Sequence, residues 1–102
     1  MNQAERRTFL IDALLKEHPD ASAVDAPRTA SAQRNLLRTL MNVRMPEPIA
    51  PEILQVQDAY LQERLVERGG ATRAAELPFH DRIALWRGDI TLLEADAIVN
   101  AA

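Results

Sequence analysis

The chain of 102 residues contains no cysteine and only two histidines, and aromatic side chains make up 4% of it. Without cysteine these residues offer no disulfide framework, no thiol nucleophile and no thiolate ligand for a metal. The two imidazoles, His18 and His80, lie in different segments, and neither has a second ligand at the spacing of three or four residues that zinc sites show. The sequence therefore predicts no metal ligand within this chain.

The chain also lacks a long apolar run and an excess of basic residues. No stretch approaches the roughly 20 apolar residues that cross a bilayer, and the first seven residues lack the apolar core of a secretion signal. With a net charge of −3 and a pI near 5.3, Lys and Arg do not gather as phosphate binding requires. These features predict a cytoplasmic protein with no membrane or nucleic-acid partner.

What the chain does contain is an ordinary globular composition, 47% hydrophobic and 26% charged, with helical periodicity in its first two thirds. Apolar residues recur at spacings of three, four and seven over residues 4–18, 31–43 and 51–68, which predicts three amphipathic helices. Ser31 is the expected N-cap of the second helix, Pro51 the first residue of the third, and Gly69-Gly70 its C-terminal cap. We expect these helices to pack on a neighbouring domain rather than to form their own core.

In the last third of the chain the spacing of apolar residues changes from that of a helix to that of a strand. Residues 82–86 alternate apolar and polar side chains, and residues 96–102 are nearly all apolar, so both are predicted to be strands. Between them, residues 91–94 have the form of a capping box, which predicts one helical turn. So short a connection is unsuited to neighbouring parallel strands, and we expect these two not to pair directly.

Gly88-Asp89 follows the first predicted strand, where open α/β sheets bind their ligands. The glycine allows a sharp turn, and the Asp89 carboxylate can accept a hydrogen bond from an exocyclic amine. The Ile90 backbone amide can donate to an adjacent ring nitrogen. Asp89 and Ile90 could thus read the edge of an adenine, although a Gly-Asp pair at a strand end is more often an ordinary turn.

Residues 88–91, Gly-Asp-Ile-Thr, followed by residues 96–102, Asp-Ala-Ile-Val-Asn-Ala-Ala, resemble the signature of the macrodomain, an ADP-ribose-binding fold. The resemblance implies that Asp89 and Ile90 hold the adenine and that Ala101 lies where backbone contacts approach the distal ribose. Asn100 is a further candidate, although the asparagine that binds ribose in the family follows the Ala-Ala pair. The implied fold is a three-layer α/β/α sandwich.

Residues 36–61 are more loosely similar to the helical N-terminal extension of the zinc-dependent macrodomains, through Leu-Arg-Thr-Leu-Met-Asn-Val-Arg-Met-Pro at positions 37–46. That subgroup removes ADP-ribose from modified protein side chains with a zinc ion held by cysteine and histidine. The resemblance implies zinc as the cofactor of the complete protein, with its ligands and the catalytic residues beyond residue 102 and none of them within this chain. Its expected partners are ADP-ribose or an ADP-ribosylated protein, and it is expected to be a monomer.

We therefore predict an α/β chain with a helical N-terminal extension at residues 1–78 and the truncated start of a macrodomain at residues 79–102. The leading hypothesis is a protein-ADP-ribose hydrolase of which this chain is an inactive N-terminal part. A reader module that binds ADP-ribose without cleaving it is the first alternative. The second is a helical interaction protein whose C-terminus adds a strand to a partner's sheet.

Overall fold

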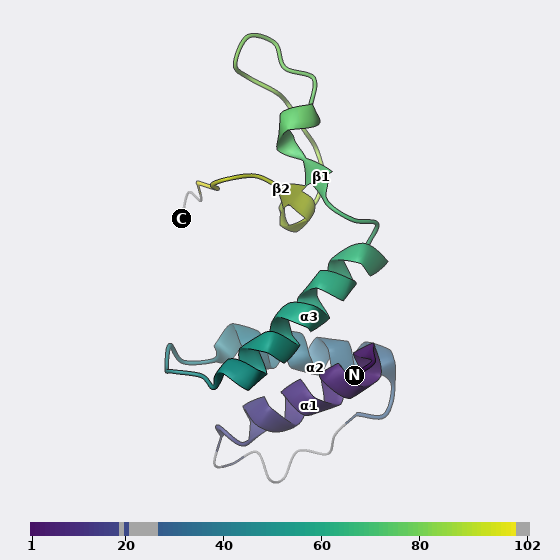
Figure 1. The fold of residues 1–102 in the computed structure, drawn as a ribbon, viewed down its shortest axis with the longest axis vertical. Helices are drawn as coiled ribbons and strands as arrows, with labels where there is room; N and C mark the ends of the chain where they lie inside the picture. Colours follow the sequence, from purple (N-terminus) through teal and green to yellow (C-terminus); the bar gives the residue numbers. More distant parts are fainter. Residues whose placement is uncertain (19, 21–26, 100–102) are drawn as a thin grey trace. The chain divides into compact units, whose positions relative to one another are not determined.

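A computed structural model describes residues 1–18, 20 and 27–99 of the chain. The described elements are α1 (Gln3–Leu15), α2 (Ala30–Val43), α3 (Pro51–Glu67), β1 (Thr72–Arg73), the 3₁₀ turn η2 (Ala74–Glu76), the 3₁₀ turn η3 (Ile90–Leu92) and β2 (Leu93–Glu94) (Figure 1). The chain divides into two compact units, Met1–Glu63 and Arg64–Ala102. The prediction of a chain with both helices and strands is confirmed.

Helix α1 begins where local hydrogen bonding favours it. The Asn2 side chain accepts a hydrogen bond from the Glu5 amide at 2.8 Å, and the Glu5 carboxylate accepts one from the Asn2 amide at 3.4 Å. This reciprocal capping box satisfies two amides that the first turn leaves without helical partners. The helix then places Leu10, Ile11 and Leu14 on one buried face, as the apolar spacing predicts.

The start of α2 differs from the prediction. Thr29, not Ser31, is the N-cap residue, because the Thr29 hydroxyl accepts a hydrogen bond from the Ala32 amide at 3.2 Å. Both residues carry a suitable hydroxyl, and the helix extends one residue before Ser31. The helix end at Val43 is confirmed, and Arg44 is the first residue with extended backbone.

Helix α3 begins at Pro51, as predicted for a residue that has no amide to leave unpaired. It ends at Glu67, and Gly69 and Gly70 follow with positive φ angles of 101° and 82°. The Gly70 amide bonds to the Leu65 carbonyl at 2.9 Å, which closes the helix with left-handed residues that glycine adopts without strain. The predicted C-terminal cap is therefore confirmed.

The three helices do form a core of their own, contrary to the prediction. Six side chains at most 7% exposed make one cluster: Leu10, Ile11, Leu14, Leu37, Leu40 and Tyr60. They come from α1, α2 and the part of α3 that lies in the first unit, and these helices pack together in Figure 1. The prediction failed because periodicity shows that a helix has a face to bury but not what covers it.

Not every apolar residue of α3 is buried. Leu54 and Leu61 are 41% and 45% exposed, whereas Tyr60 is 5% exposed and Ile53 and Val56 pack against the core. The carbonyl of Tyr60 accepts a hydrogen bond from the Gln3 side chain at 2.9 Å, which joins α3 to the start of α1. The side that carries Tyr60 is therefore the packed side.

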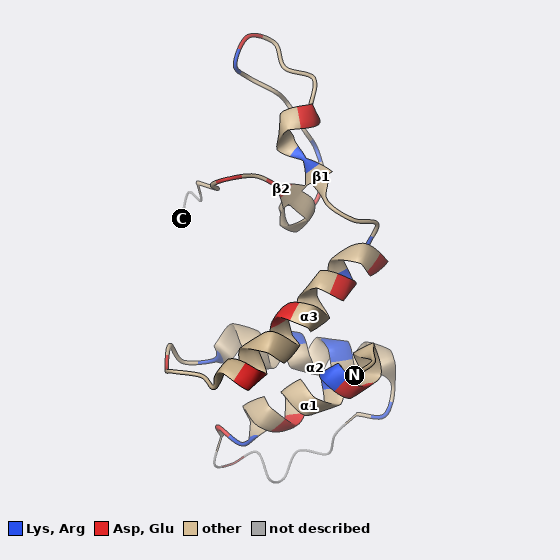
Figure 2. Ribbon diagram, viewed as in Figure 1, with Lys and Arg blue, Asp and Glu red and all other residues tan. Residues whose placement is uncertain are grey.

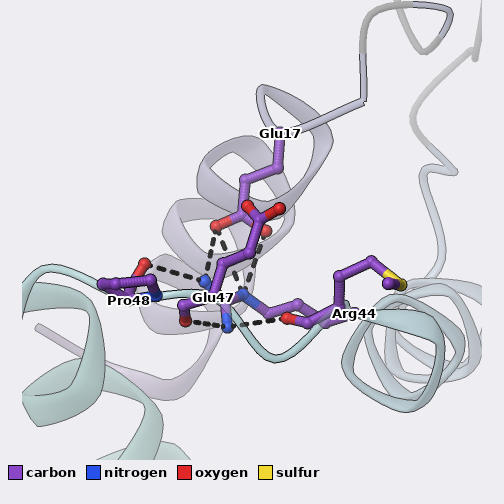
Figure 3. A network of polar contacts seen from close by, with 5 residues as sticks. Glu17, Arg44, Glu47 and Pro48 are labelled. Atoms are coloured by element: carbon purple, nitrogen blue, oxygen red, sulfur yellow. Dashed lines mark hydrogen bonds and ion pairs between the residues drawn. The ribbon is translucent and has the colours of Figure 1, made fainter.

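Arg44 joins the end of α1 to the connection between α2 and α3 (Figure 3). Its guanidinium donates to both carboxylate oxygens of Glu17, with Nε–Oε2 at 3.0 Å and Nη2–Oε1 at 3.1 Å. It also donates to the backbone carbonyls of Met45, Glu47 and Pro48 at 3.3, 2.9 and 3.2 Å. One side chain thus binds three carbonyls of a proline-rich turn, of which the Met45 carbonyl also accepts a hydrogen bond from the Glu47 amide at 2.8 Å.

In the second unit, β1 and β2 form a two-stranded parallel sheet in which Thr72 pairs with Leu93 and Arg73 with Glu94. Neither strand was predicted: β1 lies between the third predicted helix and the first predicted strand, and β2 lies within the predicted helical turn. Strand identity follows from the pairing partner, and a two-residue strand carries too short a pattern to be recognised in sequence.

The two predicted strands are not found in the described residues. Within residues 82–86 only Ile83 takes part in a bridge, an antiparallel one with His80, and residues 84–86 are irregular. Residues 96–99 are irregular and exposed, and residues 100–102 lie outside the described part. Ile83 and Leu85 are 70% and 92% exposed, so in the described chain no partner buries the alternating face.

Candidate functional site

Asp89 lies at the start of η3 as its N-cap residue, not at the end of a strand. Its Oδ1 accepts hydrogen bonds from the Thr91 amide at 2.9 Å and from the Thr91 hydroxyl at 2.7 Å. The Leu92 amide bonds to the Asp89 carbonyl at 2.9 Å. The predicted capping box at residues 91–94 is therefore wrong: Asp89 caps the turn, and Leu93 already belongs to β2.

The other oxygen of Asp89 meets Arg68, which directly follows α3. Arg68 Nη2 donates to Asp89 Oδ2 in an ion pair, and Arg68 Nη1 donates to the Thr91 hydroxyl oxygen at 3.3 Å. Arg68, Asp89 and Thr91 thus form a closed triangle of polar contacts within the second unit. The guanidinium fork fixes the carboxylate from one side while Thr91 holds it from the other.

These contacts decide the ionisation of Asp89. The hydrogen bond from the Thr91 side chain lowers the pKa of the Asp89 carboxyl most, followed by the Thr91 backbone amide, and the Arg68 charge lowers it further against partial desolvation. Asp89 is accordingly a carboxylate at neutral pH. Its side chain is 43% exposed, so the carboxylate is open to a ligand from solvent.

Ile90 is adjacent to Asp89 as the first residue of η3, with 52% of the residue exposed. The amide at the first position of a 3₁₀ turn has no acceptor inside the turn. An acceptor on the Asp89 carboxylate and a donor on the Ile90 backbone therefore lie on neighbouring residues. This is the pair of groups that an adenine edge requires.

Gly88 is required for a reason other than the predicted turn. Its φ is not in the left-handed region, but a Cβ at this position would lie 2.8 Å from Cη2 and 3.0 Å from Cε2 of Trp86. The indole of Trp86 therefore lies directly across the Gly88 backbone. A close approach of a ring, rather than a strained backbone angle, explains the glycine beside Asp89.

The remaining predicted site residues, Asn100 and Ala101, lie outside the described residues. The sequence did not predict two residues of the site, Arg68 and Thr91. The Asp-x-Thr spacing of residues 89–91 is typical of a side-chain cap and could have indicated Thr91. Nothing local could have indicated Arg68, because its contact with Asp89 spans 21 positions of sequence.

Charged side chains elsewhere in the described chain form pairs of opposite sign. The structure pairs Arg6 with Glu63, Arg64 with Glu67 and Arg73 with Glu76. Figure 2 shows Lys and Arg interleaved with Asp and Glu along the helices. In the described residues no helix has the length and apolar character of a membrane span, and no three His, Cys, Asp or Glu side chains gather as metal ligands would.

The chain is similar over its whole length to a protein-ADP-ribose hydrolase of Treponema medium, with 47% identity over 106 residues that cover 100% of this chain and 41% of the relative. The resemblance to protein-ADP-ribose hydrolases is confirmed. Proteins of the same name from Staphylococcus aureus strains MRSA252 and Mu50 are 39% and 36% identical over 99 and 97 residues, covering 95% of this chain and 36% of each relative. No protein-family model and no solved structure matches the chain.

The chain spans about two fifths of the length of the protein-ADP-ribose hydrolases that it matches. The match to the Treponema medium protein includes both units, so the helical core and the Asp89 turn both belong to the similar region. The similarity therefore concerns the whole chain and not the motif around Asp89 alone.

Proposed function

We propose that this chain is the N-terminal part of a protein-ADP-ribose hydrolase, and that Asp89 and Ile90 contact the adenine of its ADP-ribose group. The observation that carries the proposal is the similarity of the whole chain to proteins of that name. In this proposal residues 79–102 belong to the start of a macrodomain, and residues 1–78 are its helical N-terminal extension. The protein is a cytoplasmic monomer that acts on ADP-ribosylated proteins.

The chemistry of residues 89 and 90 supports an adenine contact. An ionised Asp89 carboxylate accepts a hydrogen bond from the exocyclic amine, and the Ile90 amide donates to the neighbouring ring nitrogen. Oδ1 already accepts two hydrogen bonds from Thr91, and Oδ2 accepts one from Arg68. A carboxylate has about four acceptor positions, so Oδ2 keeps one for the amine.

The resemblance implied zinc for the complete protein, with its ligands outside this chain, so the described residues do not test that expectation. Among residues 1–18, 20 and 27–99 no set of three or more His, Cys, Asp or Glu side chains could hold a metal ion. We therefore assign no step of the reaction to zinc. In our proposal residues 1–102 contribute part of the binding site, and by themselves hydrolyse no ADP-ribosylated protein.

Asp89→Ala in the full-length protein tests the proposal. We expect ADP-ribose to bind about 10- to 100-fold more weakly, because a charge-assisted hydrogen bond to the base is lost. Isothermal titration calorimetry with ADP-ribose measures this. Asp96→Ala, which removes another exposed carboxylate from the same unit, is the control. Unchanged affinity in Asp89→Ala would remove this residue from the site.

The release of ADP-ribose from a modified protein separates a hydrolase from a reader module. We expect the full-length protein to release free ADP-ribose, detected by mass spectrometry. Binding of ADP-ribose without any release would instead support the reader alternative. The names of the relatives favour the hydrolase.

A further inference from the structure

The contacts of Asp89 leave its carboxylate little freedom to rotate. Thr91 binds Oδ1 twice, through its amide at 2.9 Å and its hydroxyl at 2.7 Å, while Arg68 binds Oδ2. Arg68 also binds the Thr91 hydroxyl oxygen at 3.3 Å, so its fork spans both partners. Thr91 alone would hold one oxygen, and Arg68 determines where the other one points.

That second oxygen is the one with acceptor capacity left for a ligand. A bound base would therefore meet Oδ2 beside the Arg68 guanidinium, with the amide of Ile90 on the next residue. Adenine offers an amine donor and a ring acceptor to these two groups. Hypoxanthine instead offers a carbonyl oxygen and an N–H, so each of its groups would meet one of like kind.

We propose that Arg68 is a positioning residue that aims Asp89 Oδ2 at the exocyclic amine of the base and thereby gives the site its preference for adenine over hypoxanthine. This inference rests on the proposed function, because it presumes that Asp89 faces the base. Arg68 itself touches no ligand in this arrangement. It acts through the carboxylate, which its fork holds in one orientation.

The test compares two ligands, ADP-ribose and inosine diphosphate ribose, which differ in the base, on the full-length protein. The measured quantity is the ratio of their dissociation constants, which a loss of folded protein alone does not change. We expect Arg68→Met to lower the preference for ADP-ribose about tenfold, as expected when a directed hydrogen bond to a charged group is no longer held in place. Arg68→Lys, which keeps the charge, should restore part of it.

Arg64→Met is the matched control. Arg64 lies one helical turn before Arg68 and pairs with Glu67, with side-chain exposure of 31% against 41% for Arg68. The Arg64→Met variant should keep the wild-type preference for ADP-ribose over inosine diphosphate ribose. If Arg68→Met does not fold, Arg68→Lys, which keeps the charge but loses the guanidinium fork, takes its place: a ratio below that of the wild type supports the proposal, and an unchanged ratio overturns it.

Asp89→Ala distinguishes a failure of the adenine contact from a failure of the positioning role of Arg68. If both Asp89→Ala and Arg68→Met lose the preference, Arg68 positions the carboxylate as proposed. If Asp89→Ala loses it and Arg68→Met keeps it, the positioning role is wrong while the adenine contact stands. If Asp89→Ala itself keeps the preference, Asp89 does not read the base, and the proposal for Arg68 fails with it.

Discussion

Asp89 is both a cap of a 3₁₀ turn and an exposed acceptor, and both roles need its carboxylate to be ionised. The fold lowers its pKa below the ordinary value of 3.8, chiefly through Thr91. The stability from the ionised form is therefore fully present above pH 3.8 and is lost as pH falls through the lower pKa of the folded state. The cap should thus weaken only in acid.

We expect Asp89→Asn to remove this part of the acid dependence of unfolding. Denaturant titrations at a series of pH values, followed by fluorescence, measure it, since Trp86 is the single tryptophan. Asp96→Asn, which removes an exposed charge from the same unit, should keep the wild-type profile. An acid profile of Asp89→Asn that matches the wild type would contradict the pKa shift.

Gly88 gives a second prediction at the residue scale. Gly88→Ala places a methyl group where the Trp86 indole lies, with ring atoms at 2.8 and 3.0 Å, so the ring must move. We expect a shift of the tryptophan emission to longer wavelength as the half-buried indole meets more water. Asp89 is adjacent, so weaker ADP-ribose binding should accompany the shift. An unchanged spectrum would mean that the ring does not lie across Gly88.

At the scale of elements, the Arg44 side chain links two segments that helix packing does not connect. Its contacts with Glu17 and with the carbonyls of residues 45, 47 and 48 connect the end of α1 to the turn before α3 (Figure 3). The side chain is 17% exposed, so these bonds are screened less than those of a surface pair. The turn contains two prolines, which cannot donate the backbone hydrogen bonds that would otherwise order it.

We expect Arg44→Met to destabilise the first unit by about 1 to 2 kcal/mol, because a buried stem is kept and the hydrogen bonds are lost. Arg38→Met, an exposed arginine of the same helix, should change the free energy of unfolding by less than about 0.5 kcal/mol. Urea unfolding followed by circular dichroism measures both. Equal stabilities of the two variants would mean that Arg44 does not stabilise the turn.

At the scale of the whole molecule, the first unit depends on one small core. Leu10 and Leu37 are 0% and 1% exposed, and the cluster draws on all three helices of that unit. Large side chains of the second unit stay exposed in the described residues, among them Ile83 at 70% and Leu85 at 92%. The two units thus differ in how they bury apolar surface.

Leu37→Ala should destabilise the first unit by about 2 to 5 kcal/mol through lost burial and the cavity it leaves. Leu61→Ala makes the same change at a position that is 45% exposed and should have an effect below about 1 kcal/mol. Thermal unfolding followed by circular dichroism compares the two. Similar melting temperatures would contradict the assignment of the core.

The helices were predictable because their signals are local. The apolar spacing of α1 and α2, Pro51 at the start of α3 and the Gly69-Gly70 cap each act within a few residues, and all are found. The N-cap of α2 was missed because Thr29 and Ser31 carry equivalent hydroxyls. Local chemistry predicts that a helix starts there, but not which of two equal residues starts it.

The sequence by itself determined the three helices, the likeness to protein-ADP-ribose hydrolases and the place of Asp89 and Ile90 in the chain. Only the tertiary structure decided that the helices share a core, that β1 pairs with β2, and that Arg68 holds the carboxylate of Asp89. The physical reason is the separation in sequence over which each interaction acts. Capping and periodicity act between residues a few positions apart, whereas a core, a strand pair and the Arg68 contact form between residues that are distant in sequence and become neighbours only when the chain folds.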